Sequence, residues 1–192
     1  MRGPGLEKTL QKEVKASAFT LCDENGRERA KLSVVNGDPL LWFADAKGNP
    51  KMTVGLASGG DPQIILADEK GVGRVGLDLS KGGPSVFLRD AKGDIRLGLD
   101  FDEEHGISVL TFCGADSVTR LQMRVDTENQ FSDAVFFDDS KAPRIRVMSG
   151  GDDQSVSIMD ETGKVLAILS DGGIILMSQD GATQIINAKS RL

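Results

Sequence analysis

The stretch that decides the fold is VFLRDAKGDIRLGLDF, residues 86–101. On both sides of its central Asp-Ala-Lys-Gly, apolar residues alternate with other residues. This is the pattern of two strands that each keep one wet face and are joined by a turn. The glycine supplies the positive φ that a tight hairpin turn needs. The stretch therefore predicts a β-hairpin.

The same pattern recurs along the chain, at residues 19–34, 41–56 and 64–79. We call the aspartate before each turn the marker aspartate. It stands at Asp23, Asp45, Asp68, Asp90, Asp138 and Asp160, with Gly114 and Ser178 in the equivalent positions of two other copies. Copies recur every 22 to 24 residues, with a last step of 18. Residues 18–192 are thus predicted to hold seven full copies and a shortened eighth.

This periodicity predicts an all-β fold, a repetitive antiparallel β-hairpin array of about sixteen short strands. A β-solenoid of stacked parallel coils is the alternative, because its coil length fits the same period. The dipeptides Asn25-Gly26, Lys47-Gly48, Lys70-Gly71 and Lys92-Gly93 favour hairpins closed by two-residue type I′ turns.

A two-residue loop at Lys92-Gly93 puts Leu88 opposite Leu97 and Val86 opposite Leu99, so the apolar residues of both strands share one face. A three-residue loop would put them on opposite faces. We expect the shared face to be the core of the array.

The first strand of each copy is apolar on its other face too, at Trp42, Ile65, Phe87 and Val135. A lone sheet would leave these side chains in water, so they are a possible interaction surface. They favour self-association, as a dimer or trimer, or binding of another protein.

Residues 1–17 are predicted to form a separate N-terminal segment. Leu6, Leu10 and Val14 recur every four residues among charged residues, the pattern of a short helix with one apolar stripe. Such a helix would cap the first repeat or meet its own copies in an oligomer.

The hairpin pattern LxDxxGxxRxxL resembles repeats of uncharacterised bacterial proteins, to which no function is attached. It is also loosely similar to the tyrosine-aspartate repeats of bacterial toxin shells. The residue before the marker aspartate is never tyrosine, however, but Cys22, Ala44, Ala67 or Arg89. A helix ahead of a repetitive β-shaft is similar in architecture to trimeric phage fibres, which implies nothing about function.

Composition narrows the functional classes. The net charge of −6 disfavours nucleic acid as a partner. No apolar run has the length of a secretory signal or a membrane span, which predicts no membrane insertion and a cytoplasmic location, or alternatively a place in a phage-like particle. The two cysteines, Cys22 and Cys113, have no metal-site spacing.

Candidate catalytic groups are few. His105 follows Asp102, Glu103 and Glu104 in an acidic loop, and a single histidine with carboxylates is a weak start for a metal site or an acid–base centre. One aspartate every 22 to 24 residues is too sparse for a calcium roll, and turn stabilisation explains it better. We therefore expect no enzyme activity, no catalytic residue, no cofactor and no metal.

The sequence favours a non-catalytic structural or protein-interaction scaffold that forms a homo-oligomer. The alternative is a ligand- or glycan-binding module that uses the degenerate fifth and sixth copies, around residues 114–151. There the turn glycine is replaced by Ser117 and Lys141.

Overall fold

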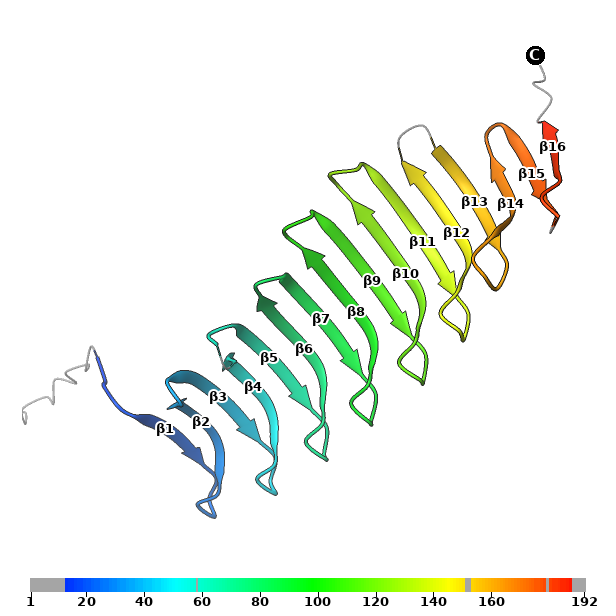
Figure 1. The fold of residues 1–192 in the computed structure, drawn as a ribbon. Coiled ribbons are helices and arrows are strands. Elements are labelled where there is room, and N and C mark those ends of the chain that lie inside the picture. Colours follow the sequence, from blue (N-terminus) through cyan, green and yellow to red (C-terminus); the bar gives the residue numbers. More distant parts are fainter. Residues whose placement is uncertain (1–12, 58, 151–152, 179, 188–192) are drawn as a thin grey trace, which may run out of the picture.

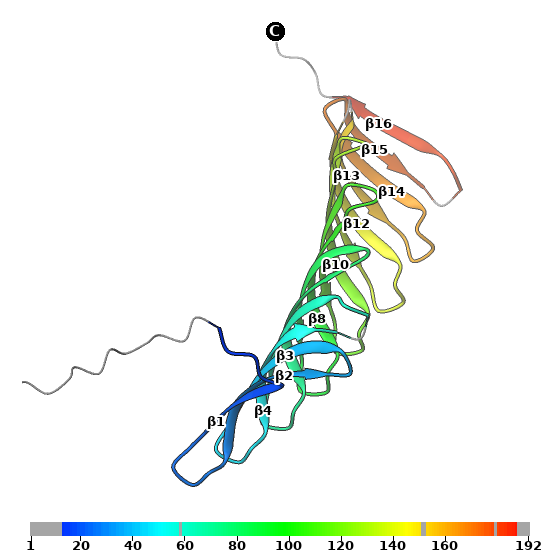
Figure 2. The same ribbon diagram turned by 90° about the vertical axis from the view of Figure 1, so that its left-hand side faces the viewer.

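The protein is an open, twisted, single-layer β-sheet (Figures 1 and 2). The computed structural model describes residues 13–57, 59–150, 153–178 and 180–187. These residues form sixteen strands in one sheet, and every strand pairs with the next along the chain. The predicted all-β hairpin array is confirmed.

Each copy contributes one hairpin, and the strands are five to eight residues long. Their bounds are β1 Ala18–Cys22, β2 Glu28–Val35, β3 Asp38–Ala44, β4 Pro50–Leu56, β5 Pro62–Ala67, β6 Gly73–Ser80, β7 Gly83–Arg89, β8 Ile95–Asp102, β9 Ile107–Cys113, β10 Thr119–Asp126, β11 Phe131–Phe137, β12 Pro143–Gly150, β13 Asp153–Met159, β14 Val165–Ser170, β15 Gly173–Met177 and β16 Thr183–Asn187.

All neighbouring strands are antiparallel, so the chain zigzags through the sheet and does not wind in parallel coils. The expected N-terminal helix falls mainly on residues 1–12, which lie outside the described residues. Residues 13–17 are exposed and not helical.

The predicted type I′ turns are wrong. In the first hairpin the Gly26 N–H donates to the Asp23 carbonyl and the Asp23 N–H donates to the Arg27 carbonyl, which encloses three loop residues. Gly26 has a φ of 76°, and Asn25 is not in the positive-φ region. A type I′ turn needs positive φ at both central residues, whereas this turn needs it only at the glycine. Lysine at the position of Asn25 in later copies fits that lower demand.

The predicted strand register is nevertheless correct: Leu88 lies opposite Leu97 and Val86 opposite Leu99. A β-bulge reconciles the three-residue loop with this register. Arg89 pairs with Ile95 and Leu88 with Leu97, so Arg96 is an extra residue in the returning strand. The extra residue shifts the pairing by one and restores the shared face.

Cross-strand partners define two faces of the sheet. We call one the apolar face. Its central row runs through all strands: Phe19, Leu32, Leu41, Val54, Ile64, Leu77, Val86, Leu99, Leu110, Met123, Ala134, Val147, Val156, Leu169, Ile174 and Ile186. We call the other the mixed face, because polar and apolar residues share it.

The expectation that the apolar face is a packed core is wrong. Among the described residues no large side chain is fully buried, and the buried apolar residues are only Ala30, Ala44 and Met159. The accessible surface is 13996 Å², whereas a compact protein of this mass would expose about 9,000 Å². A single sheet has two faces and no second layer, so its apolar face stays in contact with water.

Candidate functional site: an uncovered apolar sheet face

The apolar face carries nearly all of the exposed large apolar side chains. The exceptions are Val14, which precedes β1, and Val35, Ile95 and Ile185. Exposure is 48% at Leu99 and 52% at Leu169, although both belong to the central row. A soluble monomer rarely exposes so large a contiguous apolar area, which marks such a face as an interaction site.

A second row lies beside the central row, nearer to the turns that carry the marker aspartates. We call it the near row. It is apolar except at its last position: Leu21, Ala30, Phe43, Met52, Leu66, Val75, Leu88, Leu97, Phe112, Leu121, Phe136, Ile145, Ile158, Ala167, Leu176 and Gln184. The central and near rows contain no charged residue.

The apolar face is wider in the first half of the array. A third row, on the other side of the central row, is apolar from β2 to β8 through residues such as Val34, Leu56 and Leu79. From β9 it becomes largely polar, with Ser108, Ser132, Ser149 and Gln154. The apolar face therefore narrows toward the C-terminal half.

Two hollows lie on the apolar face. The larger, of about 570 Å³, is lined by Leu32, Leu41, Ile64 and Leu77 among others. The smaller, of about 350 Å³, lies over β8 to β12 and includes Met123 in its lining. Both are open to solvent and lined mainly by aliphatic side chains, so they suit apolar side chains of a partner.

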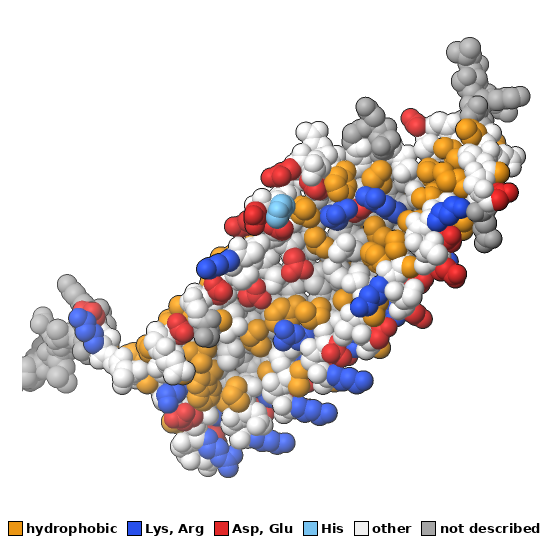
Figure 3. All heavy atoms as spheres, in the orientation of Figure 1, with side chains coloured by type: hydrophobic (Ala, Val, Ile, Leu, Met, Phe, Trp, Pro, Cys, Tyr) orange, Lys and Arg blue, Asp and Glu red, His pale blue; other side chains and the backbone are white. Residues whose placement is uncertain are grey.

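The four residues predicted as an interaction surface lie on the mixed face. Trp42 is opposite Thr53, Ile65 opposite Gly76, and Val135 opposite Arg146. All four, including Phe87, are only half-buried by their neighbours. Figure 3 shows a face of the molecule on which apolar, acidic and basic side chains are interspersed. A role of these residues in binding stays a prediction.

Phe87 shows how the mixed face covers its own large side chains. The cross-strand partners of Phe87 are Gly76 and Gly98, and the Phe87 ring occupies the space that a Cβ at Gly76 would need. The Arg89 guanidinium lies 4.1 Å from the ring centroid. Glycine and a stacked arginine thus shield the aromatic ring without a second layer.

The degenerate fifth and sixth copies hold a charge cluster on the mixed face that the sequence did not reveal. The Asp133 side chain is 2% exposed and lies 2.9 Å from Arg124 and 2.8 Å from Arg146. Arg124 also lies over the Phe131 ring at 4.7 Å. A buried carboxylate needs such partners, because an unpaired one would be strongly destabilising. Cross-strand pairing brings these residues together, and their spacing in the sequence carries no repeat signal.

The marker aspartates close the turns that lie along one side of the sheet, at the ends of the strands. We call this side the aspartate edge. The Oδ1 atom of Asp45 accepts the N–H groups of Lys47 at 2.8 Å and Asn49 at 3.0 Å. The Asn49 N–H, opposed by desolvation and helped by the Asn49 side chain, lowers the pKa of Asp45 to about 2. This bonding confirms turn stabilisation as the role of the marker position.

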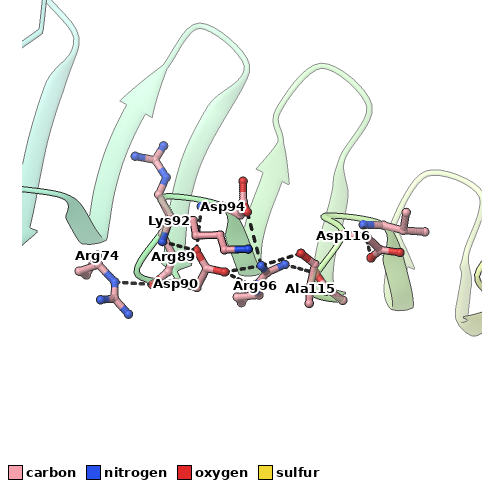
Figure 4. Close-up of polar contacts among 10 residues, drawn as sticks. Arg74, Arg89, Asp90, Lys92, Asp94, Arg96, Ala115 and Asp116 are labelled. Atoms are coloured by element: carbon pink, nitrogen blue, oxygen red, sulfur yellow. Dashed lines mark hydrogen bonds and ion pairs between the residues drawn. The ribbon is translucent and has the colours of Figure 1, made fainter.

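In the first five copies the basic bulge residue links its turn to the next. Arg74 Nε donates to the Arg89 carbonyl at 2.7 Å, and its Nη1 donates to Asp68 Oδ2 at 3.2 Å. Arg96 does the same one copy further on, between Asp90 and the Ala115 carbonyl (Figure 4). Equivalent basic bulge residues are Arg29, Lys51, Arg120 and Arg144.

Each of these basic bulge residues already has an acidic partner at the aspartate edge. Together they therefore offer little free charge to an acidic ligand. Ion pairs or hydrogen bonds to aspartate join Arg29 to Asp23, Lys51 to Asp45 and Arg120 to Asp116. The basic bulge residues therefore act mainly within the array, where they connect neighbouring hairpins.

His105 lies in the loop between β8 and β9. Its Nδ1 is 2.9 Å from Asp102 Oδ2, and both side chains are exposed. The hydrogen bond and charge of Asp102 raise the pKa of His105. His105 therefore pairs with Asp102 on an exposed turn.

Within the described ranges, no three histidine, cysteine, aspartate or glutamate residues are grouped so that they would hold a metal ion. Cys22 is exposed and Cys113 half-buried, and neither forms a disulfide. Among the described residues there is also no helix that is long and apolar enough to cross a membrane.

Comparison with known proteins adds no functional assignment: no family model and no curated protein matches the chain. The apolar face is therefore the feature that points to a function. Sequence reasoning identified its residues but interpreted them as core. A count of strands could have given the missing signal. All the predicted strands are needed to build this face, so none of the described strands remains to form a second sheet over it.

Proposed function

We propose that the protein is a non-catalytic structural or protein-interaction scaffold, and that it acts as a homo-oligomer whose copies cover each other's apolar faces. The observation that carries this proposal is the uncharged central and near rows, of which more than half the side chains are exposed in the single chain. A second copy offers a face of the same length, the same twist and the same apolar character. Two sheets of this kind pack face to face in β-sandwiches.

The available area is sufficient for a stable complex. Sixteen strands spaced by about 4.8 Å make a face about 75 Å long, and two rows are about 14 Å wide. Each chain of the oligomer would then contribute about 1,000 Å², which is the area that stable protein interfaces need. Removing aliphatic side chains from water supplies the driving force.

Light scattering at micromolar concentration tests the oligomer directly. At the lowest concentrations, where the mass no longer changes on dilution, we expect two or three times 20.5 kDa. Leu99→Lys, in the centre of the apolar face, should lower the mass to that of one chain, because a buried lysine without a partner opposes association.

Gln122→Lys is the matched control, since it places the same charge on the neighbouring part of the mixed face. It should leave the mass unchanged. A wild-type protein that scatters as a monomer of 20.5 kDa, or equal behaviour of the two variants, would remove the oligomer from the proposal.

A second candidate function is ligand binding at the degenerate copies. The observation in its favour is the hollow of about 350 Å³, which reaches Val147, Met148 and Ser149 within residues 114–151. Its aliphatic lining favours an apolar ligand over a glycan. A thermal-shift panel of lipids, metabolites and glycans tests it, and a panel without any shift would count against it.

We further propose that the scaffold works in the cytoplasm, with a place in a phage-like particle as the alternative. Its elongated, repetitive shape (Figure 1) supports the alternative, a place in a larger particle. Repeat arrays commonly use such extended surfaces to assemble with other proteins.

A further inference from the structure

The two ends of the sheet are open strand edges, and this feature is independent of the apolar face. β1 and β16 each pair with only one strand among the described residues. The outer N–H and C=O groups of such strands can pair with another chain. The residues of β1 and β16 therefore determine whether a strand of another chain can pair with them.

Both edge strands are short, but they lack charge and proline, two features that normally prevent strand addition. Natural edge strands are blocked by charged residues, proline or bulges. The sequences of β1, AFTLC, and β16, TQIIN, contain no charged residue and no proline. The extra bulge residue of the first hairpin, Arg29, lies on β2 and not on the edge strand.

Both edges also carry exposed apolar side chains. Leu21 of β1 is 69% exposed and Ile185 of β16 is 60% exposed. Residues 13–17, which lead into β1, are themselves exposed and form no strand over its edge. The described part of the chain therefore leaves both edges available.

The two edges are complementary to each other. Consecutive strands are antiparallel, so an even-numbered strand such as β16 is antiparallel to an odd-numbered one such as β1 when the arrays are placed in line. In the register that continues the rows, Ile186 of one copy lies opposite Phe19 of the next, and Ile185 lies opposite Thr20. The central row of the apolar face then continues across the junction, and the near row places Gln184 opposite Leu21.

From this we propose that copies of the protein join end to end, with β16 of one copy pairing with β1 of the next to extend a single continuous sheet. The occupant of each edge is a second copy of this chain, because it presents an uncharged strand of the required direction and the same face pattern. Such a joint is not closed by symmetry, so it produces chains of variable length.

Electron microscopy of the full-length protein over a range of concentrations tests the joint. Particle lengths should be multiples of one array, about 75 Å for sixteen strands, and should grow with concentration. Ile185→Lys places a charge at the edge and on the mixed face, so it should stop growth and leave the apolar face intact.

Two further variants separate the edge effect from other causes. Ile185→Thr keeps the edge uncharged and should still elongate, as should Gln122→Lys, which adds the same charge in an inner strand. Ile185→Lys protein keeps a free β1, so a small fraction mixed into wild-type protein should cap chains and shorten them in proportion.

Three outcomes would overturn the proposal. They are particles of one array length at every concentration, particles that stop at two lengths because identical edges pair with each other, and elongation that Ile185→Lys does not change. None of these outcomes bears on face-to-face packing. Leu99→Lys tests that packing separately, by mass, in the Ile185→Lys background in which end-to-end growth is stopped.

Discussion

At the scale of single residues, each turn depends on one carboxylate and one backbone conformation. The marker aspartate accepts backbone N–H groups from two and four residues later, as Asp23 does from Asn25 and Arg27. The residue three positions on adopts positive φ, which glycine does without strain. In the fifth copy Gly114 replaces the aspartate, and Asp116 accepts the Val118 N–H instead. The turn therefore survives the loss of its marker.

The degenerate turns should be improvable. Ser117 occupies the glycine position with a φ of 62°, and such a conformation costs a residue other than glycine or asparagine about 1 kcal/mol. We expect Ser117→Gly to raise the free energy of unfolding by about 1 kcal/mol in urea titrations. Gly71→Ala, at a φ of 80° with open space around its Cα, should lower it by a similar amount. Changes of the same sign in both variants would contradict the assignment of this turn position to positive φ.

The marker carboxylates should make the protein sensitive to acid. Because the pKa of Asp45 is lowered to about 2, its ionised form is favoured by folding, and its contribution is present above about pH 4. That contribution is lost as the pH falls toward 2. The pKa values of Asp23, Asp68 and Asp90 are shifted in the same direction.

Asp45→Asn keeps an oxygen acceptor in the turn but cannot titrate. Its melting temperature should therefore fall less steeply between pH 4 and pH 2 than that of the wild type, as circular dichroism melts would show. Glu24→Gln, at an exposed turn position, is the control. A slope as steep as that of the wild type would argue against the role of Asp45.

At the scale of secondary-structure elements, the bulge is what makes one hairpin fit the next. It compensates the three-residue loop, so both strands keep their apolar residues on one face. It also points the basic residue toward the neighbouring turn, as Arg74 reaches Arg89 and Lys51 reaches Asp68. The seventh copy has Leu166 at the bulge, and there Lys164 approaches the Ser178 carbonyl.

Removing a bulge cation should loosen two neighbouring hairpins. Arg74→Met keeps most of the side-chain stem and removes two hydrogen bonds, so we expect a loss of about 1 kcal/mol in the free energy of unfolding. Arg74→Lys should recover part of it, since Lys51 makes the same contact with one ammonium group. Hydrogen exchange at the turns that follow Asp68 and Asp90 reports the local effect. Lys70→Met, an exposed turn change, should leave exchange unaltered.

At the scale of the whole molecule, the sheet is a single layer, and much of its apolar surface can be buried only by association. If copies cover each other, association and stability are coupled, because partner binding favours the folded state by mass action. The melting temperature should then rise as the protein concentration is increased from about 5 µM to 500 µM in calorimetry. A melting temperature independent of concentration would show that the single sheet is stable without a partner.

The hairpins, the number of strands, the register and the two faces could all be predicted from the sequence. These features depend on local alternation and on the repeat, and both can be read from stretches such as residues 86–101. The turn type was not predictable in the same way. Two-residue loops and three-residue loops with a bulge give the same strand register, and only backbone hydrogen bonds such as that of Gly93 to Asp90 distinguish them.

Whether the apolar face is covered could not be predicted from the sequence and follows from the arrangement of the strands in space. Alternation indicates which side of a strand is apolar, but it does not say whether a second layer exists to bury that side. Leu99 has the sequence signature of a core residue and is nearly half exposed. Likewise, Asp133 has no signature in the repeat and is the carboxylate that two arginines enclose. Both outcomes depend on contacts between strands, which the pattern along one strand does not contain.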